Sequence, residues 1–241
     1  MLEHDGSPCY DCAVESQGVR RMPVQQRSRE RVERILDACA ELLDEVGSDG
    51  LTITEVARRA GVPTGTVYQF FEGRPGLLRQ LALRHLDILI GRLRARAAGE
   101  PGLDWPRAGR IVIEETVQMR RVIPGFTVVD FGEARPGGEK YLPEGTTEAG
   151  GDILAERLYR FAVEEAGLPP LADPYRVTSL AIQAAAAGLE LAFRTSREGD
   201  TAMIEQTGHL LAAYFADAAR RSRADLPGPE GPAPTDQDGG Q

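Results

Sequence analysis

The run from Thr52 to Phe71 carries a spacing of residue types that suits contact with a nucleic acid. Ala57 precedes Gly61 by four positions, and Val67 follows Gly61 by six. A small residue lets two helices approach closely, a glycine adopts the positive φ of a tight turn, and an apolar residue packs the second helix inward. The pattern therefore predicts a helix-turn-helix whose second helix can enter the major groove of DNA.

Other reactive side chains do not form a catalytic or metal-binding set. Cys9 and Cys12 make a lone CxxC, whereas a structural zinc site needs four ligands. His85 and His209 fall on or beside apolar helical faces, where a core histidine with satisfied hydrogen bonds is the usual finding. The chain also has no Gly-x-Ser-x-Gly and no glycine-rich phosphate loop followed by lysine. We therefore expect no enzymatic activity, no metal and no cofactor.

The net charge of −9 argues at first against a nucleic-acid partner. The average hides an asymmetry, because residues 20–96 hold 14 Arg and 10 Asp or Glu and so carry +4. A basic segment on an acidic body is compatible with a DNA reader. No apolar run is long enough to span a bilayer and no secretory signal is visible, so we expect a cytoplasmic protein without a membrane partner.

Apolar periodicity predicts helices through most of the chain and no persistent strand. Thr52 and Glu55 form an expected capping box, Gly47 an expected helix stop, and Pro75 an expected first-turn residue. We expect tails at 1–24 and 225–241, a DNA-binding domain at 25–74 and a helical body at 75–224. The predicted helices are 31–46, 52–60, 64–71, 75–96, 104–121, 126–133, 150–166, 173–196 and 200–222, with a loop at 135–150.

The segments Leu51–Val62 and Gly65–Phe71 resemble the N-terminal domain of the TetR family of transcriptional regulators. The preceding helix at Arg31–Val46 and the following Arg74–Leu78 match as well, so the resemblance covers residues 27–78. It implies an all-α fold with an N-terminal three-helix, helix-turn-helix DNA-binding domain and a C-terminal helical domain for ligand binding and dimerisation.

The resemblance also implies contacts with double-stranded DNA. Thr64, Gly65 and Thr66 would face base edges or nearby phosphates, and Gln69 would read a base or bind phosphate. The phosphate contacts would come from the Tyr68 hydroxyl, the backbone N–H of Thr52 and the charge of Arg74. The implied DNA-binding residues are thus Thr52, Thr64, Gly65, Thr66, Tyr68, Gln69 and Arg74.

The sequence departs from the family pattern just before the second helix of the motif. Pro63 stands where a serine is common, and serine is a natural helix cap. The cap then falls to Thr64 or Val62, and the start of the helix shifts by one residue.

The helical body is expected to supply a dimer contact and a ligand pocket. The predicted helices at 173–196 and 200–222 read as an antiparallel hairpin that would pair with a second copy, although their apolar residues also suit the core of one chain. Candidate pocket residues, each of which also suits a core position, are Trp105, Met119, Phe126, Phe131, Tyr159, Phe161 and Gln183. The sequence names no effector.

Together these features predict a homodimeric repressor that an unknown small molecule releases from a palindromic operator. The alternatives are an activator or an effector-independent regulator of the same fold, and a helical protein-interaction module.

Overall fold

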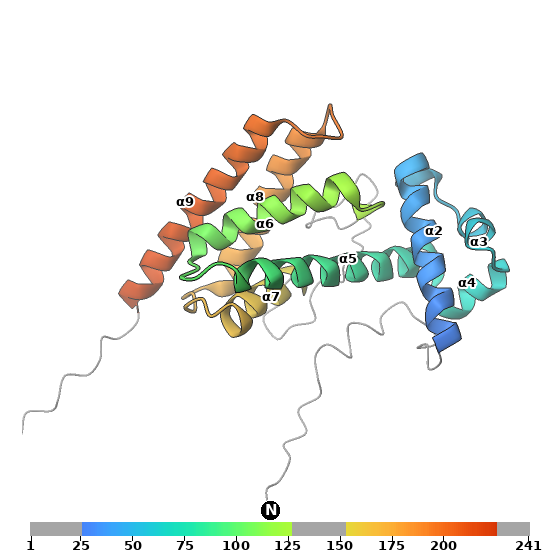
Figure 1. The fold of residues 1–241 in the computed structure, drawn as a ribbon, viewed down its shortest axis with the longest axis horizontal. Helices are drawn as coiled ribbons and strands as arrows, with labels where there is room; N and C mark the ends of the chain where they lie inside the picture. The colour runs from blue at the N-terminus through green and yellow to red at the C-terminus, as the bar shows by residue number, and fades with distance from the viewer. Residues whose placement is uncertain (1–25, 127–152, 226–241) are drawn as a thin grey trace, which may run out of the picture.

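A computed structural model describes residues 26–126 and 153–225, and every regular element within these ranges is helical (Figure 1). The predicted all-α fold class is confirmed. Phe131, the expected tail at 1–24, the expected loop at 135–150 and nearly all of the expected 126–133 helix lie outside the described residues. The same holds for the expected C-terminal tail except Asp225, which ends the last helix. The elements are α2 (Gln26–Gly50), α3 (Ile53–Ala60), α4 (Thr64–Phe70), α5 (Gly73–Ala98), α6 (Trp105–Val122), α7 (Ile153–Arg160), η2 (Phe161–Glu165), α8 (Pro174–Phe193) and α9 (Thr201–Asp225).

Helices α2, α3 and α4 gather at one end of the molecule (Figure 1), where their apolar faces form one end of a longer hydrophobic cluster. Ile35, Cys39, Val56 and Val67 are all fully buried within it. Burial raises the pKa of the Cys39 thiol to about 12, so this cysteine is an un-ionised core residue. The regular part of α2 stops at Gly47, which has φ 70° and ψ 179°, as the sequence predicts.

Helix α5 runs from this end of the molecule into the helical body (Figure 1). The predicted domain boundary between residues 74 and 75 therefore falls inside its first turn. Arg84 of α5 pairs with Glu33 and Asp37 of α2 at 3.1 and 2.7 Å, so ion pairs at the surface link the two helices.

The helices of the body begin at the caps that the sequence supplies. The side chains of Asp104, Asp173 and Asp200 accept hydrogen bonds from backbone N–H groups in the first turns of α6, α8 and α9. Helices α8 and α9 form the expected hairpin, which is closed by Asp200 N donating to Ala192 O at 2.8 Å.

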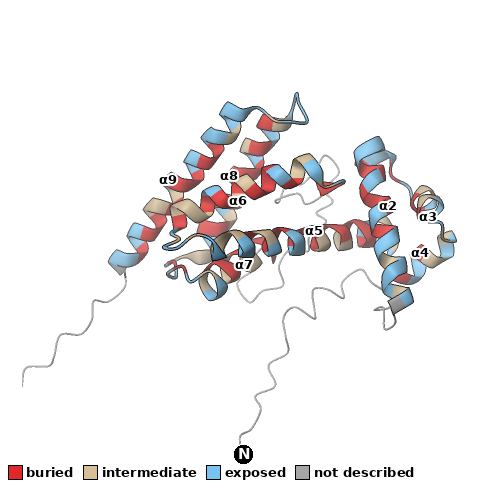
Figure 2. Ribbon diagram, viewed as in Figure 1, coloured by how far each residue is buried: buried red, intermediate tan, exposed pale blue. Residues whose placement is uncertain are grey.

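The apolar face of this hairpin divides into a buried and an exposed side (Figure 2). Leu189, Leu211 and Phe215 are buried against α6 and the rest of the body. Leu180 and Leu210 remain 57% and 54% exposed, and Leu191 is 47% exposed. The interpretation as intramolecular core is therefore confirmed for the buried residues, and the dimer contact predicted from the sequence stays a prediction, for which the exposed leucines are available.

Two hydrophobic clusters organise the packing of residues 26–126 and 153–225. The first runs from α2, α3 and α4 along α5 and reaches Met119 and Phe126 at the end of α6. The second lies within the body, around Trp105, Leu211 and Phe215. Because the first cluster is shared by the helix-turn-helix and the body, a shift in one can be transmitted to the other through packed side chains.

Two properties of the described helices concern membranes and metals. No helix within residues 26–126 and 153–225 combines the length and apolar character of a bilayer span. The same ranges hold no group of three side chains that could ligate a metal ion.

Candidate nucleic-acid interface and internal cavity

The turn of the predicted helix-turn-helix has the expected geometry. Gly61 adopts φ 64° and ψ 38°, which is the left-handed conformation, and ends α3. Val62 N then donates to Ala57 O at 3.0 Å. Helix α4 is thereby set across α3, with Val67 and Phe70 buried beneath it.

The outer face of α4 gathers five of the seven expected DNA-contacting residues. Gly65, Tyr68 and Gln69 are exposed to solvent, and Tyr68 is 49% exposed. Thr64 and Thr66 are half-buried at the start of the same helix. Hydroxyl and amide groups on one exposed helical face are suited to hydrogen bonds with phosphates and base edges.

Thr52 caps α3, but the reciprocal half of the expected capping box is replaced. The Thr52 hydroxyl accepts a hydrogen bond from Glu55 N at 3.2 Å, as predicted. The Glu55 carboxylate accepts from Arg58 Nε and Nη2 at 2.9 and 2.5 Å instead of returning to the backbone of Thr52. A charged donor one turn ahead is the stronger partner for a carboxylate.

Pro63 itself occupies the cap position of α4. It has φ −59° and ψ 143° and supplies no side-chain hydrogen bond, while its carbonyl accepts from Thr66 N at 2.8 Å. The expectation that Thr64 or Val62 would be the cap is therefore wrong. Helix α4 begins at Thr64 because proline's φ suits the residue before a helix.

The arginines of this region are largely engaged within the protein. Arg74 Nη2 donates to the carbonyl and, at 2.8 Å, to the hydroxyl of Ser48. Arg59 binds both oxygens of Glu45 at 2.6 Å, and this hydrogen bonding holds the pKa of the Glu45 carboxyl below its usual value. Arg59 is therefore a structural link between α3 and α2, and phosphate binding by Arg74 stays a prediction.

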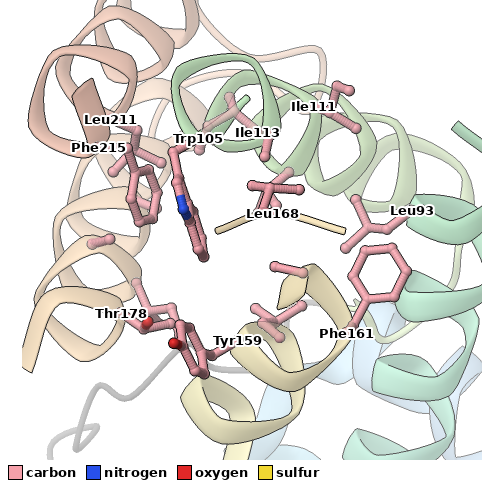
Figure 3. A pocket seen from close by; sticks show the side chains of 18 of the residues that line it. Leu93, Trp105, Ile111, Ile113, Tyr159, Phe161, Leu168, Thr178, Leu211 and Phe215 are labelled. Carbon is pink, nitrogen blue, oxygen red and sulfur yellow. The ribbon is translucent and has the colours of Figure 1, made fainter. Parts of the chain in front are cut away.

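An internal cavity lies in the body where the two hydrophobic clusters meet (Figure 3). The cavity has a volume of about 70 Å³, counted as the space that the centre of a water molecule can occupy. Residues of α5, α6, α7, η2, α8 and α9 line it, and the helix widens into a π turn at Phe161 and Ala162 on its wall. Such widened turns are frequent at functional sites.

The expected pocket residues separate into lining and non-lining groups. Trp105, Tyr159 and Phe161 line the cavity. Met119 and Phe126 are instead fully buried in the first cluster, because α6 packs against α5 there and Phe126 lies against His85 of α5. Gln183 is exposed because α8 turns this position outward. The assignment of these last three to the pocket is thus corrected, and Phe131 lies outside the described residues.

Sequence reasoning missed two hydroxyl groups on the wall of this cavity. Thr116 of α6 and Thr178 of α8 line it, and their side chains are almost completely buried. The available signal was the position of each threonine on an otherwise apolar helical face, because buried polar groups are less common there than aliphatic ones.

An ion-pair cluster joins the helix that lines the cavity to the helix that leads to α4. Glu115 lies next to Thr116 on α6, and its side chain is 6% exposed. Its two oxygens accept from Arg92 Nε at 2.7 Å and Arg96 Nη1 at 2.9 Å on α5. A displacement of α6 would therefore act directly on α5.

Replacing Glu115 by Gln is expected to lower the free energy of unfolding by about 1–2 kcal/mol, because Arg92 and Arg96 would face a neutral amide. The effect stays below that of a fully buried pair because water reaches both guanidinium groups. Urea unfolding followed by Trp105 fluorescence measures it. The matched control Glu198→Gln, at a side chain that is 81% exposed, should change stability by less than about 0.5 kcal/mol. Equal losses in the two variants would contradict a special role for the cluster.

A second link connects the far end of α6 to α2. Asp44 of α2 accepts a hydrogen bond from Gly125 N at 2.9 Å and pairs with Arg197 Nη2 at 3.2 Å. Figure 1 shows this end of α6 pointing toward α2. The helix-turn-helix is thus tied to the body both through α5 and through this contact.

Comparisons with known proteins agree with this architecture. Residues 35–81 match the family described as bacterial regulatory proteins, tetR family. The HTH-type transcriptional regulator BetI of Escherichia coli O45:K1 is 36% identical over 77 residues, which is 30% of this chain and 40% of BetI. The chain therefore aligns with about 40% of the length of this curated relative.

Two solved structures extend the similarity to the body. A TetR-family transcriptional regulator from Streptomyces coelicolor is 37% identical, with a TM-score of 0.65 over 78% of this chain and 99% of that chain. FadR from Bacillus subtilis, solved in complex with stearoyl-CoA, is 15% identical, with a TM-score of 0.50 over 76% of this chain and 98% of that chain. The second likeness shows the fold alone.

Proposed function

Since this chain belongs to the TetR family of bacterial regulatory proteins, we propose that it is a sequence-specific transcriptional regulator that acts as a homodimeric repressor. The observation that carries the proposal is the exposed polar face of α4, set across α3 by the left-handed turn at Gly61. A protein that binds the bacterial chromosome in this way acts in the cytoplasm.

In this proposal, α4 enters the major groove. Thr64, Gly65, Thr66 and Gln69 approach base edges or nearby phosphates, and Tyr68 donates its hydroxyl to a phosphate oxygen. The backbone N–H of Thr52 and the charge of Arg74 supply sequence-independent affinity, which falls as salt rises because bound counterions are released.

The test starts from fragmented genomic DNA, from which the full-length protein selects bound fragments. Fluorescence anisotropy on the enriched sequence then measures affinity, stoichiometry and salt dependence. We expect an inverted repeat with half-sites about 34–36 Å apart and two protomers per site. Retention of fragments without any shared sequence would refute sequence-specific regulation.

Removing the hydroxyl of Tyr68 distinguishes a phosphate contact, which positions the protein on any DNA, from a base contact, which reads the sequence. Tyr68→Phe is expected to weaken binding of the dimer about thirtyfold on operator and unrelated DNA alike, because each of the two protomers loses one phosphate hydrogen bond of about 1 kcal/mol. Anisotropy titrations on both DNAs measure this. Tyr175→Phe, a matched change at an exposed tyrosine on α8, should leave both affinities unchanged. A loss confined to the operator would contradict the phosphate role.

The exposed side of the α8–α9 hairpin supports dimerisation. Two such faces, carrying Leu180, Leu191 and Leu210, can pack as a four-helix interface with two-fold symmetry. A dimer is also what a repeated half-site requires.

Placing a charge on this face is expected to separate the protomers. Leu210→Asp should raise the dimer dissociation constant at least about a hundredfold, because the symmetric interface would bury two unpaired carboxylates. Sedimentation equilibrium measures the change. Val46→Asp, at a 50% exposed position on α2, serves as control and should leave the mass unchanged. A Leu210→Asp protein that stays dimeric would place the interface elsewhere.

The cavity is the proposed effector site. An effector that binds one arrangement of the helices better than the other shifts the population by that difference in affinity. The routes are the Glu115 cluster, which joins α6 to α5, and the Asp44–Gly125 contact, which joins α6 to α2. Both would change the position of α4 relative to its partner in the dimer.

A further inference from the structure

The chemistry of the cavity wall restricts what it can hold. Among the described residues that line it, none carries a charge. Its two aromatic polar groups already bind the protein: Trp105 Nε1 donates to Pro169 O at 2.8 Å, and the Tyr159 hydroxyl accepts from Leu171 N at 3.2 Å and keeps its own proton to donate. The wall offers a charged ligand no opposite charge.

Two further polar atoms on this wall are buried without a partner. Thr116 Oγ1 and Thr178 Oγ1 have no hydrogen-bond partner among the described residues, and their residues are 1% and 5% exposed. A buried hydroxyl without a hydrogen bond is costly, and valine would fill nearly the same volume without that cost. Neither oxygen presents surface to the cavity as it stands, so the hydroxyls of the two threonines would meet a ligand's polar atom after rotation about χ1.

The shape of the wall favours a ring. Trp105 stacks on Tyr159 and Phe215, with ring centroids 6.0 and 5.3 Å apart and interplanar angles of 11° and 25°. Figure 3 shows these side chains and Phe161 directed toward one space. Flat aromatic surfaces pack well against another planar ring. One water needs about 10–15 Å³ of the volume that its centre can occupy. The cavity volume of about 70 Å³ on the same measure therefore has room for roughly five to seven waters, or a molecule of one or two rings.

We propose that the cavity binds an uncharged, mainly apolar ring compound that carries a hydroxyl or carbonyl group, and that Thr116 and Thr178 bind this group. The inference rests on the proposed function only in treating the bound molecule as the effector. A carboxylate or ammonium ligand is rejected because its charge would be desolvated without compensation. The nearby carboxylate of Glu115 is already bound to Arg92 and Arg96.

Trp105 supplies the measurement because it is the single tryptophan of the chain and lines the cavity. Its fluorescence is followed while the full-length protein is titrated with indane, 2-indanol or indane-2-carboxylate. These three probes share one ring system and differ in having no polar group, a neutral hydroxyl or a negative charge. We expect 2-indanol to bind most tightly and the carboxylate to bind at least about a hundredfold more weakly than 2-indanol.

Valine substitutions test the two hydroxyls while keeping the shape of the cavity. In Thr116→Val combined with Thr178→Val, the affinity for 2-indanol should fall about tenfold, while the affinity for indane stays the same or rises. Each single variant should show part of this loss. Thr201→Val, at an exposed threonine in the first turn of α9, is the matched control and should bind all three probes like the parent.

Three results would overturn the proposal: equal affinity for the carboxylate and 2-indanol, no change in 2-indanol affinity in the double variant, or no binding of any probe. DNA binding is measured separately, without probe, by anisotropy on the selected operator. A protein that fails to bind DNA refutes the proposed function, while the tryptophan titrations still decide the ligand class. A protein that binds DNA but behaves in one of the three ways refutes the ligand class alone.

Discussion

Replacing Gly125 by alanine is expected to lower the free energy of unfolding by about 3 kcal/mol and to detach the end of α6 from α2. Gly125 has φ +65°, where a residue with a Cβ is strained by about 1–2 kcal/mol. Its new Cβ would also lie 2.8 Å from Ala40 Cα and 3.0 Å from Ala40 O. These are backbone atoms that cannot rotate away, so overpacking adds about 1–3 kcal/mol.

Urea unfolding gives the stability change, and a matched glycine separates the two causes. Gly102 has φ +76°, and a Cβ added there would meet no atom within 4 Å, so Gly102→Ala carries the backbone strain without the clash. We expect Gly102→Ala to lose about 1 kcal/mol. If Gly125→Ala lost no more stability than Gly102→Ala, the close packing of Gly125 against Ala40 of α2 would be refuted. A regulator with the looser contact should also respond less to an effector, because one of its two routes is broken.

The parts of the fold that sequence reasoning identified depend on neighbours in the chain. Gly61 follows Ala57 by four residues, and the turn they make is local. Asp104, Asp173 and Asp200 each cap a helix through a backbone group three residues ahead. Such interactions are set by residue type and spacing, so one sequence is sufficient to predict them.

The features that were missed depend on packing between distant segments. Arg74 lies in the position expected for a phosphate contact, yet its guanidinium binds Ser48, which is 26 residues earlier. Met119 and Trp105 both lie on apolar sides of α6, but one faces packed side chains and the other a cavity. Periodicity identifies a buried face and cannot tell whether its partner fills the space.

The same reasoning explains the outcome for His85. The sequence predicts a core histidine with satisfied hydrogen bonds, and the structure confirms the burial at 1% exposure. Neither ring nitrogen has a hydrogen-bond partner among the described residues. The imidazole instead packs against the ring of Phe126, with centroids 5.8 Å apart. Which groups face a buried side chain is decided by tertiary packing, so this difference was not visible in the sequence.

Stability is expected to fall by about 3 kcal/mol between pH 6.5 and pH 4 through His85 alone. Burial, with a smaller contribution from the charge of Arg84, lowers the pKa of His85 from 6.5 to about 4. The unfolded chain therefore binds a proton in this window that the folded chain does not bind. The free energy of unfolding consequently rises with pH from about 4 to 6.5, is fully gained above 6.5 and is lost as the pH falls toward 4.

Urea unfolding at closely spaced pH values, compared between the parent and His85→Leu, isolates this contribution from that of the carboxylates. The difference in stability between the two proteins should change by about 3 kcal/mol across the window, because leucine does not titrate. His209→Gln, a substitution at an exposed histidine, is measured in parallel as the control. If the stability of the parent and of His85→Leu changed with pH in parallel, His85 would bind its proton equally well in the folded and unfolded chains. That result would mean that water reaches the imidazole. Because Phe126 follows Gly125, the Gly125→Ala protein should show a weaker pH dependence, as loss of the Phe126 ring exposes His85 and returns its pKa toward 6.5.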